Sequence, residues 1–222
     1  TVRAWKRCEA LNLPRAIVIT GLDKENADFD ATVAALQDVW GARCEVVTFP
    51  TDDKKGVVDA LSATGGKADE IRAKLTDVAA ESSDALIEKV LGGETLTADE
   101  LSGGLRASVA QAKFIPIFAV MARQSVGLDE LLAGFARLLP SPADRPGKDA
   151  AGNAVNPAAD APLVAQVWRS INDPFVGQLT LARIWGGTLR EKSEVFNAVK
   201  DQKESVGTIY FLNGKKQETV AE

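Results

Sequence analysis

Histidine is absent from the 222 residues of this chain, which also has two cysteines, one methionine and one tyrosine. The lack of histidine excludes Ser-His-Asp triads, histidine-ligated zinc and imidazole general-base chemistry. Cys8 and Cys44 lie too far apart in the sequence to form a thiol-redox or zinc pair. We therefore expect two reduced, mostly buried thiols in a cytoplasmic protein.

Long apolar runs and a strong charge bias are also missing. No run approaches the roughly 18 residues that span a bilayer. No secretory signal pattern is present and the chain starts at Thr1 rather than Met, so we expect a processed product or a fragment. Residues 161–222 hold 8 Lys and Arg against 7 Asp and Glu, and residues 1–160 hold 18 against 24. Neither part has the basic footprint of an independent nucleic-acid-binding domain.

A further absence is the phosphate-binding sequence G-x-x-x-x-G-K-[ST]. Phosphate binding of that kind needs a glycine-rich loop whose amides surround the phosphates, with a lysine and a hydroxyl for phosphate and magnesium. The glycine pairs of this chain lack that context and are predicted to be turns or helix ends; they lie at 65–66, 92–93, 103–104 and 186–187.

The first half of the chain alternates strand-like and helix-like segments. "RAIVIT" (15–20) is a β-branched run suited to a buried strand, and "RCEVVTFP" (43–50) predicts the next strand, ended by Pro50. Between them, apolar residues at helical spacing predict an amphipathic helix that ends at Gly41; they are Phe29, Val33, Leu36 and Trp40. This βαβ order predicts a parallel sheet with helices on its faces.

The middle of the chain is predicted to be mostly helical. A long helix covers about 67–91 and is bent or broken near "AAESSD", and the capping-box spacing of "TADE" (97–100) begins another. "FIPIFAV" (114–120) then predicts a second core strand, in which Pro116 favours an edge or bulged position. Leucines and Phe135 at 3- and 4-residue spacing predict a closing helix before Pro140.

A compositional boundary follows this helix. Pro, Ala, Gly and Asp dominate residues 141–162, and no periodicity survives there. Short strands separated by turn residues come next, at "PLVAQVWRSI", "QLTLARIW", "SEVFNAV" and "SVGTIYFLN". About four strands are too few for a closed barrel, so the C-terminal unit is predicted to be truncated.

Three segments together resemble the elongation factor G family of ribosomal translocation GTPases. "VITGLDKENADF" (18–29) resembles the guanine-specificity segment, in which the family has Asn-Lys-x-Asp after a strand. Residues 86–146 are similar to the close of the GTPase domain, and "APLVAQVWRSINDPFVGQLTLARIWGGTL" (161–189) resembles the opening of the second, β-barrel domain. The resemblance runs in order from about Leu13 to Glu222 and is weak only around 50–83.

The resemblance implies an α/β fold class. Residues 1–140 would be the C-terminal part of a P-loop-type GTPase domain with a helical insert at about 50–113, 141–160 a linker, and 161–222 the first strands of a truncated β-barrel domain II. The intact protein would be a cytoplasmic monomer that binds GTP or GDP and the ribosome, with no membrane or DNA partner, in a translocation-type step of elongation. Magnesium is expected only with segments that precede Thr1, and this chain alone should not hydrolyse GTP.

The resemblance also points to residues on the guanine side of the nucleotide. Asp23 matches the family aspartate, whose two oxygens accept from the ring N–H and the exocyclic amine of guanine. Thr20 and Gly21 stand where the family has Asn and Lys, so the lysine stem that covers the ring is missing. The second base-reading loop falls on Met121, Ala122 and Arg123, with Met in place of Ser. The Ala122 amide is expected to donate to the guanine carbonyl, and Arg123 either covers the base or is solvated surface.

Three alternatives stay open from the sequence. Asp23 is either a base reader or a cap of the turn before the next helix. The acidic residues Asp23, Asp28, Asp30, Asp52 and Asp53 allow a receiver-like divalent-metal site, although Asp28 and Asp30 are more simply helix N-terminal charges. The changes at Thr20, Gly21 and Met121 also allow a non-catalytic, ribosome-binding regulatory paralogue with a weakened nucleotide site.

Overall fold

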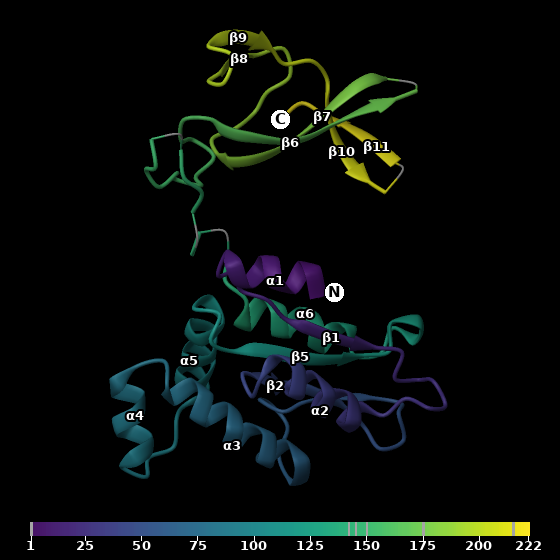
Figure 1. The fold of residues 1–222 in the computed structure, drawn as a ribbon, viewed down its shortest axis with the longest axis vertical. Coiled ribbons are helices and arrows are strands. Elements are labelled where there is room, and N and C mark those ends of the chain that lie inside the picture. The colour runs from purple at the N-terminus through teal and green to yellow at the C-terminus, as the bar shows by residue number, and fades with distance from the viewer. Residues whose placement is uncertain (1, 142, 145, 150, 175, 215) are drawn as a thin grey trace. The chain divides into compact units, whose positions relative to one another are not determined.

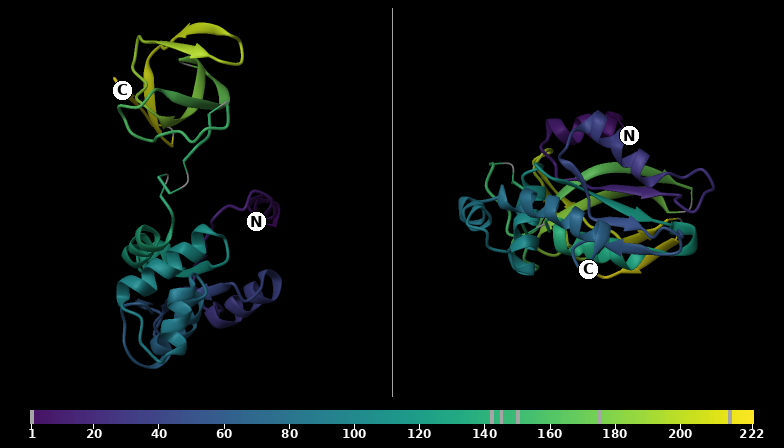
Figure 2. Two further views of the ribbon diagram at one scale, coloured as in Figure 1. Left: turned by 90° about the vertical axis from the view of Figure 1, so that its left-hand side faces the viewer. Right: turned by 90° about the horizontal axis from the view of Figure 1, so that it is seen from below.

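The computed structural model describes residues 2–141, 143–144, 146–149, 151–174, 176–214 and 216–222. The chain forms two compact units, residues 1–140 and 141–222, which are described separately below (Figures 1 and 2). Within the described residues, no helix is long and apolar enough to cross a membrane.

A three-stranded parallel sheet lies at the centre of the first unit. Strand β5 (Ile115–Val120) runs between β1 (Ile17–Thr20) and β2 (Cys44–Val46), and both neighbours are parallel to it. Helix α2 (Phe29–Trp40) connects β1 to β2, and Gly41 ends it with φ 88°. The predicted βαβ arrangement is therefore confirmed (Figure 1).

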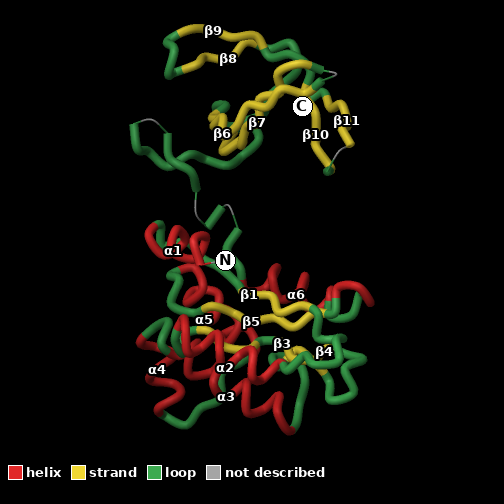
Figure 3. Tube along the Cα trace, turned by 45° about the vertical axis from the view of Figure 1, so that its right-hand side comes forward, coloured by secondary structure: helices red, strands yellow, loops and turns green. Residues whose placement is uncertain are grey.

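Helices cover the two faces of this sheet (Figure 3). On one face, Phe118 of β5 meets the ring of Phe135 in α6 (Leu128–Leu138) edge-on, with ring centroids 5.3 Å apart. Gly134 allows this approach, because a Cβ there would collide with the Phe118 ring. Ile117 and Ala119 point to the opposite face, because successive side chains of a strand alternate. Every residue of β5 is buried, so this strand anchors the core.

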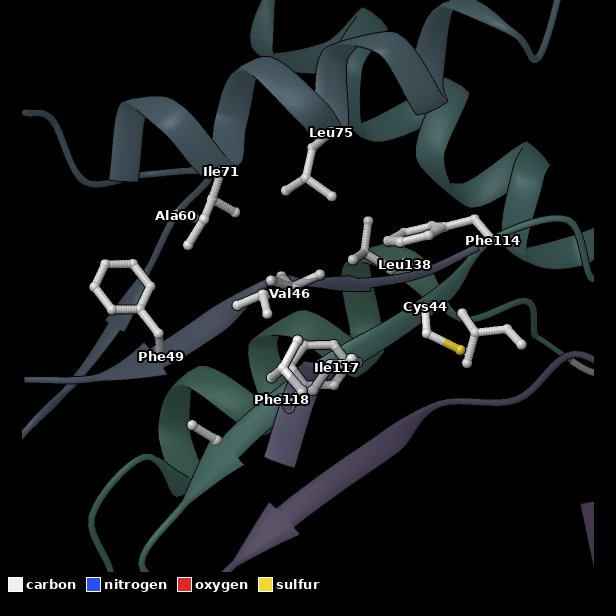
Figure 4. Packing of buried hydrophobic residues seen from close by; sticks show 14 of the residues in the cluster. Cys44, Val46, Phe49, Ala60, Ile71, Leu75, Phe114, Ile117, Phe118 and Leu138 are labelled. Carbon is white, nitrogen blue, oxygen red and sulfur yellow. The ribbon is translucent and has the colours of Figure 1, made fainter. Parts of the chain in front are cut away.

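The core continues from the sheet to the helices of the middle segment (Figure 4). Ile71 and Leu75 of α3 (Gly66–Ala80) point toward Val46 of β2, and all three side chains are buried. At the other end of the unit, Trp5 of α1 (Val2–Ala10) stacks on Trp40 with ring centroids 4.2 Å apart. These contacts join α1 and α3 to the same apolar cluster as the sheet.

The prediction of one strand over residues 43–50 is wrong. The segment forms two strands, β2 and β3 (Thr48–Pro50), because it leaves β5 after Val46. Strand β3 then pairs antiparallel with β4 (Val57–Asp59) in a separate two-stranded sheet. The separation lets Val47 bond in two directions: its amide donates to Ile117 at 2.8 Å, and its carbonyl accepts from Ala60 at 3.0 Å.

The edge or bulged position predicted from Pro116 is also wrong, because β5 is the central strand and its register with β1 and β2 is regular. The amide of Ile115 and the carbonyl of Ile117 both bond on the β2 side, to Arg43 and Val47. The intervening Pro116 therefore faces the β1 side. Pairing with β1 begins only at Ile17↔Ile117, so the proline nitrogen lies just before the ladder and removes no bond from it.

The middle segment is helical, as predicted, with the expected interruption. Helix α3 ends at Ala80 and α4 (Asp84–Leu91) begins after Ser83, whose hydroxyl accepts from the Leu86 amide. The capping box is confirmed at the start of α5 (Ala98–Ala110). The prediction that the pair Gly103–Gly104 is a turn or helix end is wrong, because both residues lie inside α5.

The described residues of the second unit form three antiparallel strand pairs. Strand β6 (Val164–Asp173) pairs with β7 (Gly177–Gly186), β8 (Glu194–Asn197) with β9 (Gln202–Ser205), and β10 (Ile209–Asn213) with β11 (Lys216–Val220). The estimate of about four strands is therefore too low, because β9 and β11 are polar and carry little apolar alternation. Figure 2 shows these strands curving around a common centre.

The segment predicted as a linker, 141–160, makes contacts within the second unit. The Val155 amide donates to the Gly147 carbonyl at 2.8 Å, and Lys148 and Ala154 form an isolated bridge. Three residues of the predicted linker, Pro142, Arg145 and Ala150, lie outside the described residues. Val155 is itself buried, so part of this segment packs with the strands that follow it.

Candidate functional site

The loops that carry the predicted site residues begin side by side. Strands β1 and β5 are adjacent and parallel, and Thr20 at the end of β1 is in register with Val120 at the end of β5. Neighbouring strands lie about 4.8 Å apart. The residues that follow, Gly21 and Met121, therefore leave the same carboxyl edge of the sheet, where open α/β sheets bind ligands.

The loop after β1 is a tight turn that leaves Asp23 in solvent. Gly21 has φ +75°, a conformation that residues with a Cβ rarely adopt. Leu22 is buried and anchors the turn, while Asp23 is exposed. The amide of Lys24 donates back to the Gly21 carbonyl at 3.2 Å. The sequence therefore builds an anchored turn that presents one carboxylate outward.

The rest of this loop is held at two further points. The ammonium group of Lys54 donates to the Ala27 carbonyl at 2.9 Å from the turn between β3 and β4. Asp28 is the N-cap of α2, and its carboxylate accepts from the Ala31 amide at 2.9 Å. The helix cap is therefore Asp28 and not Asp23; the sequence predicted Asp28 only as a charge near the helix N-terminus.

The loop after β5 is closed by a short antiparallel bridge. The Met121 amide donates to the Val126 carbonyl at 2.9 Å, and the Val126 amide donates back at 3.3 Å. Between them lies η1 (Ala122–Gln124), a single 3₁₀ turn. The side chain of Met121 is fully buried and therefore holds the loop by packing rather than by a polar contact. Arg123 is exposed on the turn.

Both loops present polar groups that the protein itself leaves unbonded. Within the described part of the chain, the Asp23 carboxylate has no hydrogen-bond or ion-pair partner. Over the same residues, the Ala122 amide donates to no acceptor. A carboxylate offers two acceptor oxygens, and a backbone amide offers one donor. Together they complement a flat ligand whose edge carries two neighbouring donors and then an acceptor.

The acidic residues near this loop do not gather into a metal site. Asp30 forms an ion pair with Lys67 at 2.7 Å, and Asp53 accepts from the Thr51 hydroxyl at 2.6 Å. No group of three or more Asp, Glu or Cys side chains suited to a metal ion occurs among the residues that the structure describes. Asp28, Asp30 and Asp53 are instead used as a helix cap, an ion pair and a turn bond, which weighs against the receiver-like alternative.

The candidate site is an open edge rather than an enclosed cavity. Two hollows of about 230 and 160 Å³ occur elsewhere, one lined by residues such as Trp185 and Arg183 and the other between α2 and α3. None of the six predicted residues lines either hollow. Two loops that leave neighbouring strands, and not a pocket, therefore mark this edge.

Sequence reasoning missed two lysines at this site. Lys54 anchors the first loop from the β3–β4 turn, a contact between residues 27 apart in the chain. The side chain of Lys24 lies over Gly21: a Cβ placed on the glycine would be 3.6 Å from its Cε and 3.8 Å from its Cδ. Both contacts depend on how the turns fold back, so no local sequence pattern could have indicated them.

The chain is similar to many known proteins, and two of them are described here. Elongation factor G from Fervidobacterium nodosum is 32% identical over 245 aligned residues, which cover 97% of this chain and 36% of that protein. A crystal structure of a protein from Thermus thermophilus matches the whole chain with a TM-score of 0.81 and 24% identity, over 34% of its own length. No family model matches the chain.

The two comparisons bear on different predictions. The structural match shows the fold, and the sequence match confirms the predicted resemblance to elongation factor G, a translation factor. The predicted fold class, an α/β unit with a parallel sheet followed by antiparallel strands, is confirmed as well. The chain spans about a third of the length of the relatives that it matches.

Proposed function

Because the chain is elongation factor G-like, we propose that it supplies the guanine-recognising side of a translational GTPase. In this proposal residues 1–140 are the C-terminal part of the GTPase domain with its helical insert, and residues 161–222 are strands of β-barrel domain II. The intact protein binds GTP or GDP and the ribosome, and acts in a translocation-type step of elongation.

The observation that carries the proposal is the register Thr20↔Val120 between β1 and β5. It brings the loop with Asp23 and the loop with Ala122 to one edge of the sheet, although the two residues are far apart in sequence. Neither the carboxylate nor the amide has a partner in the described part of the chain. A base that lies between the two loops meets both at once.

Guanine fits these two groups better than adenine does. Its ring N–H and exocyclic amine are neighbouring donors that match the two oxygens of Asp23, and its carbonyl matches the amide of Ala122. Adenine has neither the ring N–H nor the carbonyl at these positions. Hydrogen bonds to a charged group contribute about 1.5–3 kcal/mol each, so Asp23 supplies most of the selectivity.

Three residues depart from the family pattern, and all three affect how the base would be held. Gly21 has no side chain to cover the ring, and Thr20 replaces the asparagine that braces the loop. Met121 replaces a serine, but its buried side chain and its bridge to Val126 hold the second loop in place. These features favour a site that still binds nucleotide, with different supporting residues, over a site that no longer binds it.

Phosphates and magnesium are not bound by residues of this chain in the proposal. No phosphate-binding loop occurs among these 222 residues, so GTP hydrolysis is assigned to the intact protein. The ribosome is assigned as partner of the intact protein as well. Basic residues of the second unit that are available for RNA phosphate include Arg169 and Lys192, whereas Arg190 is paired with Glu222 at 3.0 Å.

The test is a titration of the intact protein with GDP, XDP and ADP by calorimetry. We expect GDP to bind and ADP to bind far more weakly. In Asp23→Asn the side-chain amide donates to the 2-oxo group of xanthine and faces the guanine amine unfavourably, so preference moves from GDP to XDP. Asp52→Asn, an equal charge change in the exposed β3–β4 turn, should leave the preference unchanged.

Two outcomes would contradict the proposal. Intact protein that binds no GDP is instead a regulatory paralogue without a working nucleotide site. Intact protein that binds GDP with the same selectivity after Asp23→Asn uses other groups to read the base. Ribosome binding by the nucleotide-free protein in co-sedimentation would support the regulatory function in the first case.

A further inference from the structure

The side chain of Lys24 lies beside the position that a Cβ on Gly21 would take. A Cβ on Gly21 would lie 3.6 Å from the Lys24 Cε, 3.8 Å from its Cδ and 4.0 Å from its Nζ. These are ordinary van der Waals distances, so the methylenes of Lys24 lie within contact of a side-chain position at residue 21. The bond from the Lys24 amide to the Gly21 carbonyl, at 3.2 Å, turns the chain back and places the stem there.

The ammonium group of this lysine is not used by the fold. In the part of the chain that the structure describes, Lys24 forms no ion pair and its Nζ donates no hydrogen bond. Its neighbour in space, Lys54, is by contrast committed to the Ala27 carbonyl. A lysine with a free head and a stem on the surface can cover an apolar face while its charge stays in water.

A base held only at its edge needs such a cover. Asp23 and Ala122 bond the rim of the ring and leave both of its faces to solvent. Burying one face gains about 25 cal/mol per Å² of apolar surface. Lys24 is one residue from Asp23 and leans back over Gly21, between that carboxylate and the end of β1.

We infer that Lys24 is the side chain that covers the guanine ring in this protein, in place of the side chain that Gly21 lacks. This inference rests on the proposed function. It adds a specific prediction to it: the cover acts on any purine face, because every base has a π-face, whereas Asp23 acts on the guanine edge. Lys24 therefore controls affinity, and Asp23 controls selectivity.

The experiment uses the intact protein and a GDP whose fluorescent N-methylanthraniloyl group is on the ribose, so that the base is unaltered. Affinities for this probe, and for GDP and XDP as competitors, are measured for the wild type, Lys24→Ala and Lys24→Met. Lys55→Ala is the matched control, since it removes an equal charge in the β3–β4 turn. Asp23→Asn is measured in parallel as the test of the proposed function.

We expect Lys24→Ala to weaken binding of GDP and XDP alike by about three- to tenfold, the effect of a few uncovered methylenes. Lys24→Met keeps the apolar stem and should bind within about twofold of the wild type. The GDP to XDP ratio should stay constant in both variants. A purely structural role of Lys24 would disturb Asp23 and change that ratio.

The outcomes separate the two claims. Wild-type affinity in Lys24→Ala, with the switch still present in Asp23→Asn, overturns the role of Lys24 and leaves the proposed function standing. Loss in Lys24→Met as large as in Lys24→Ala also overturns it, because the charge and not the stem then matters. A loss confined to Arg123→Ala would assign the cover to that residue instead. No binding by the wild type overturns both claims.

Discussion

The buried hydroxyl of Thr48 accepts a hydrogen bond from the amide of Ala119 at 2.9 Å. In the parallel ladder between β2 and β5 the next acceptor for this amide would be the Val47 carbonyl, which instead bonds the Ala60 amide. Thr48 and Ala119 are both fully buried, so no water replaces the missing partner. The threonine hydroxyl therefore replaces the missing acceptor at the place where β2 and β3 separate. On β5 this place is Ala119, two residues before Met121, where the second loop of the candidate site begins.

Replacing Thr48 by valine should destabilise the first unit. Valine has nearly the same shape but no acceptor, so the Ala119 amide becomes a buried donor without a partner, at a cost of about 1–3 kcal/mol. Thr48→Ser keeps the hydroxyl and loses one methyl group, at a cost of about 0.8 kcal/mol. Hydrogen exchange of the Ala119 amide, read by NMR, should accelerate in the valine variant only. Equal protection in both variants would show that the bond is unimportant.

The neighbouring glycines of α5 should respond in opposite directions to alanine. A Cβ on Gly104 would lie 2.7 Å from the Ala79 carbonyl oxygen of α3, whereas one on Gly103 would meet nothing within 4 Å. Gly104→Ala forces the two helices apart and should cost about 1–3 kcal/mol. Gly103→Ala only gains helix propensity and should stabilise by about 0.5–1 kcal/mol. Urea unfolding of the two variants makes the comparison, and a loss of stability in both would refute the assigned contact.

The long, periodic elements of the first unit could be predicted from the sequence. The spacing of Phe29, Val33, Leu36 and Trp40 and the capping box of Thr97 and Glu100 are local signals, and local hydrogen bonds and one packed face realise them. The break between β2 and β3 could not be predicted, because it depends on the bond from Ala119, which is 71 residues from Thr48. Pro116 was misplaced for a similar reason, since the start of the β1 ladder decides which bonds it removes.

The candidate site also has a part that could be predicted from the sequence and a part that could not. Asp23 could be proposed from the sequence because a carboxylate just beyond an apolar, β-branched run is a local feature, although only Ile19 of β1 is buried as the sequence predicted for the whole strand. The position of the Asp23 loop beside the loop of Ala122 follows from the strand order β1-β5-β2. The sequence alone did not predict this order. The position of the Lys24 stem depends on the turn at Gly21 and on its positive φ, and these are visible only in the folded chain.

The contacts of Glu100 predict that the free energy of unfolding falls in acid. Its carboxylate accepts from the Lys89 ammonium at 2.7 Å and from the Thr97 amide at 2.8 Å, and these contacts lower the pKa of Glu100 to about 2. A lowered pKa means that the folded state holds the charged form more strongly than the unfolded state does. The contribution is therefore complete above pH about 4.5 and disappears as pH falls toward about 2.

The variant Glu100→Gln isolates the charge in this prediction, because glutamine can still accept from the Thr97 amide. It should be less stable than the wild type at pH 7, and the difference should shrink steadily below pH about 4.5. Thermal unfolding of both proteins between pH 7 and pH 2.5 measures it. A difference that stays constant over this range would mean that the Lys89 ion pair does not stabilise the fold.

Replacing Ala122 by proline tests the donor that we assign to the guanine carbonyl. The amide has no acceptor in the described part of the chain, so its loss removes no bond of the fold. Met121, with φ −109° and ψ 76°, lies outside the α region that proline disfavours in the preceding residue. GDP affinity of the intact protein should fall about tenfold, the value of one hydrogen bond, with the melting temperature unchanged.

Gln124→Ala, in the same 3₁₀ turn, keeps the Ala122 amide and should bind GDP like the wild type. Calorimetric titration of the two variants separates the loss of one amide from a general disturbance of the turn. Equal GDP affinity in Ala122→Pro and in the wild type would exclude the amide as a base contact. Asp23 would then be the one assigned contact that remains at the guanine edge, and we would expect the selectivity against adenine to rest on that carboxylate.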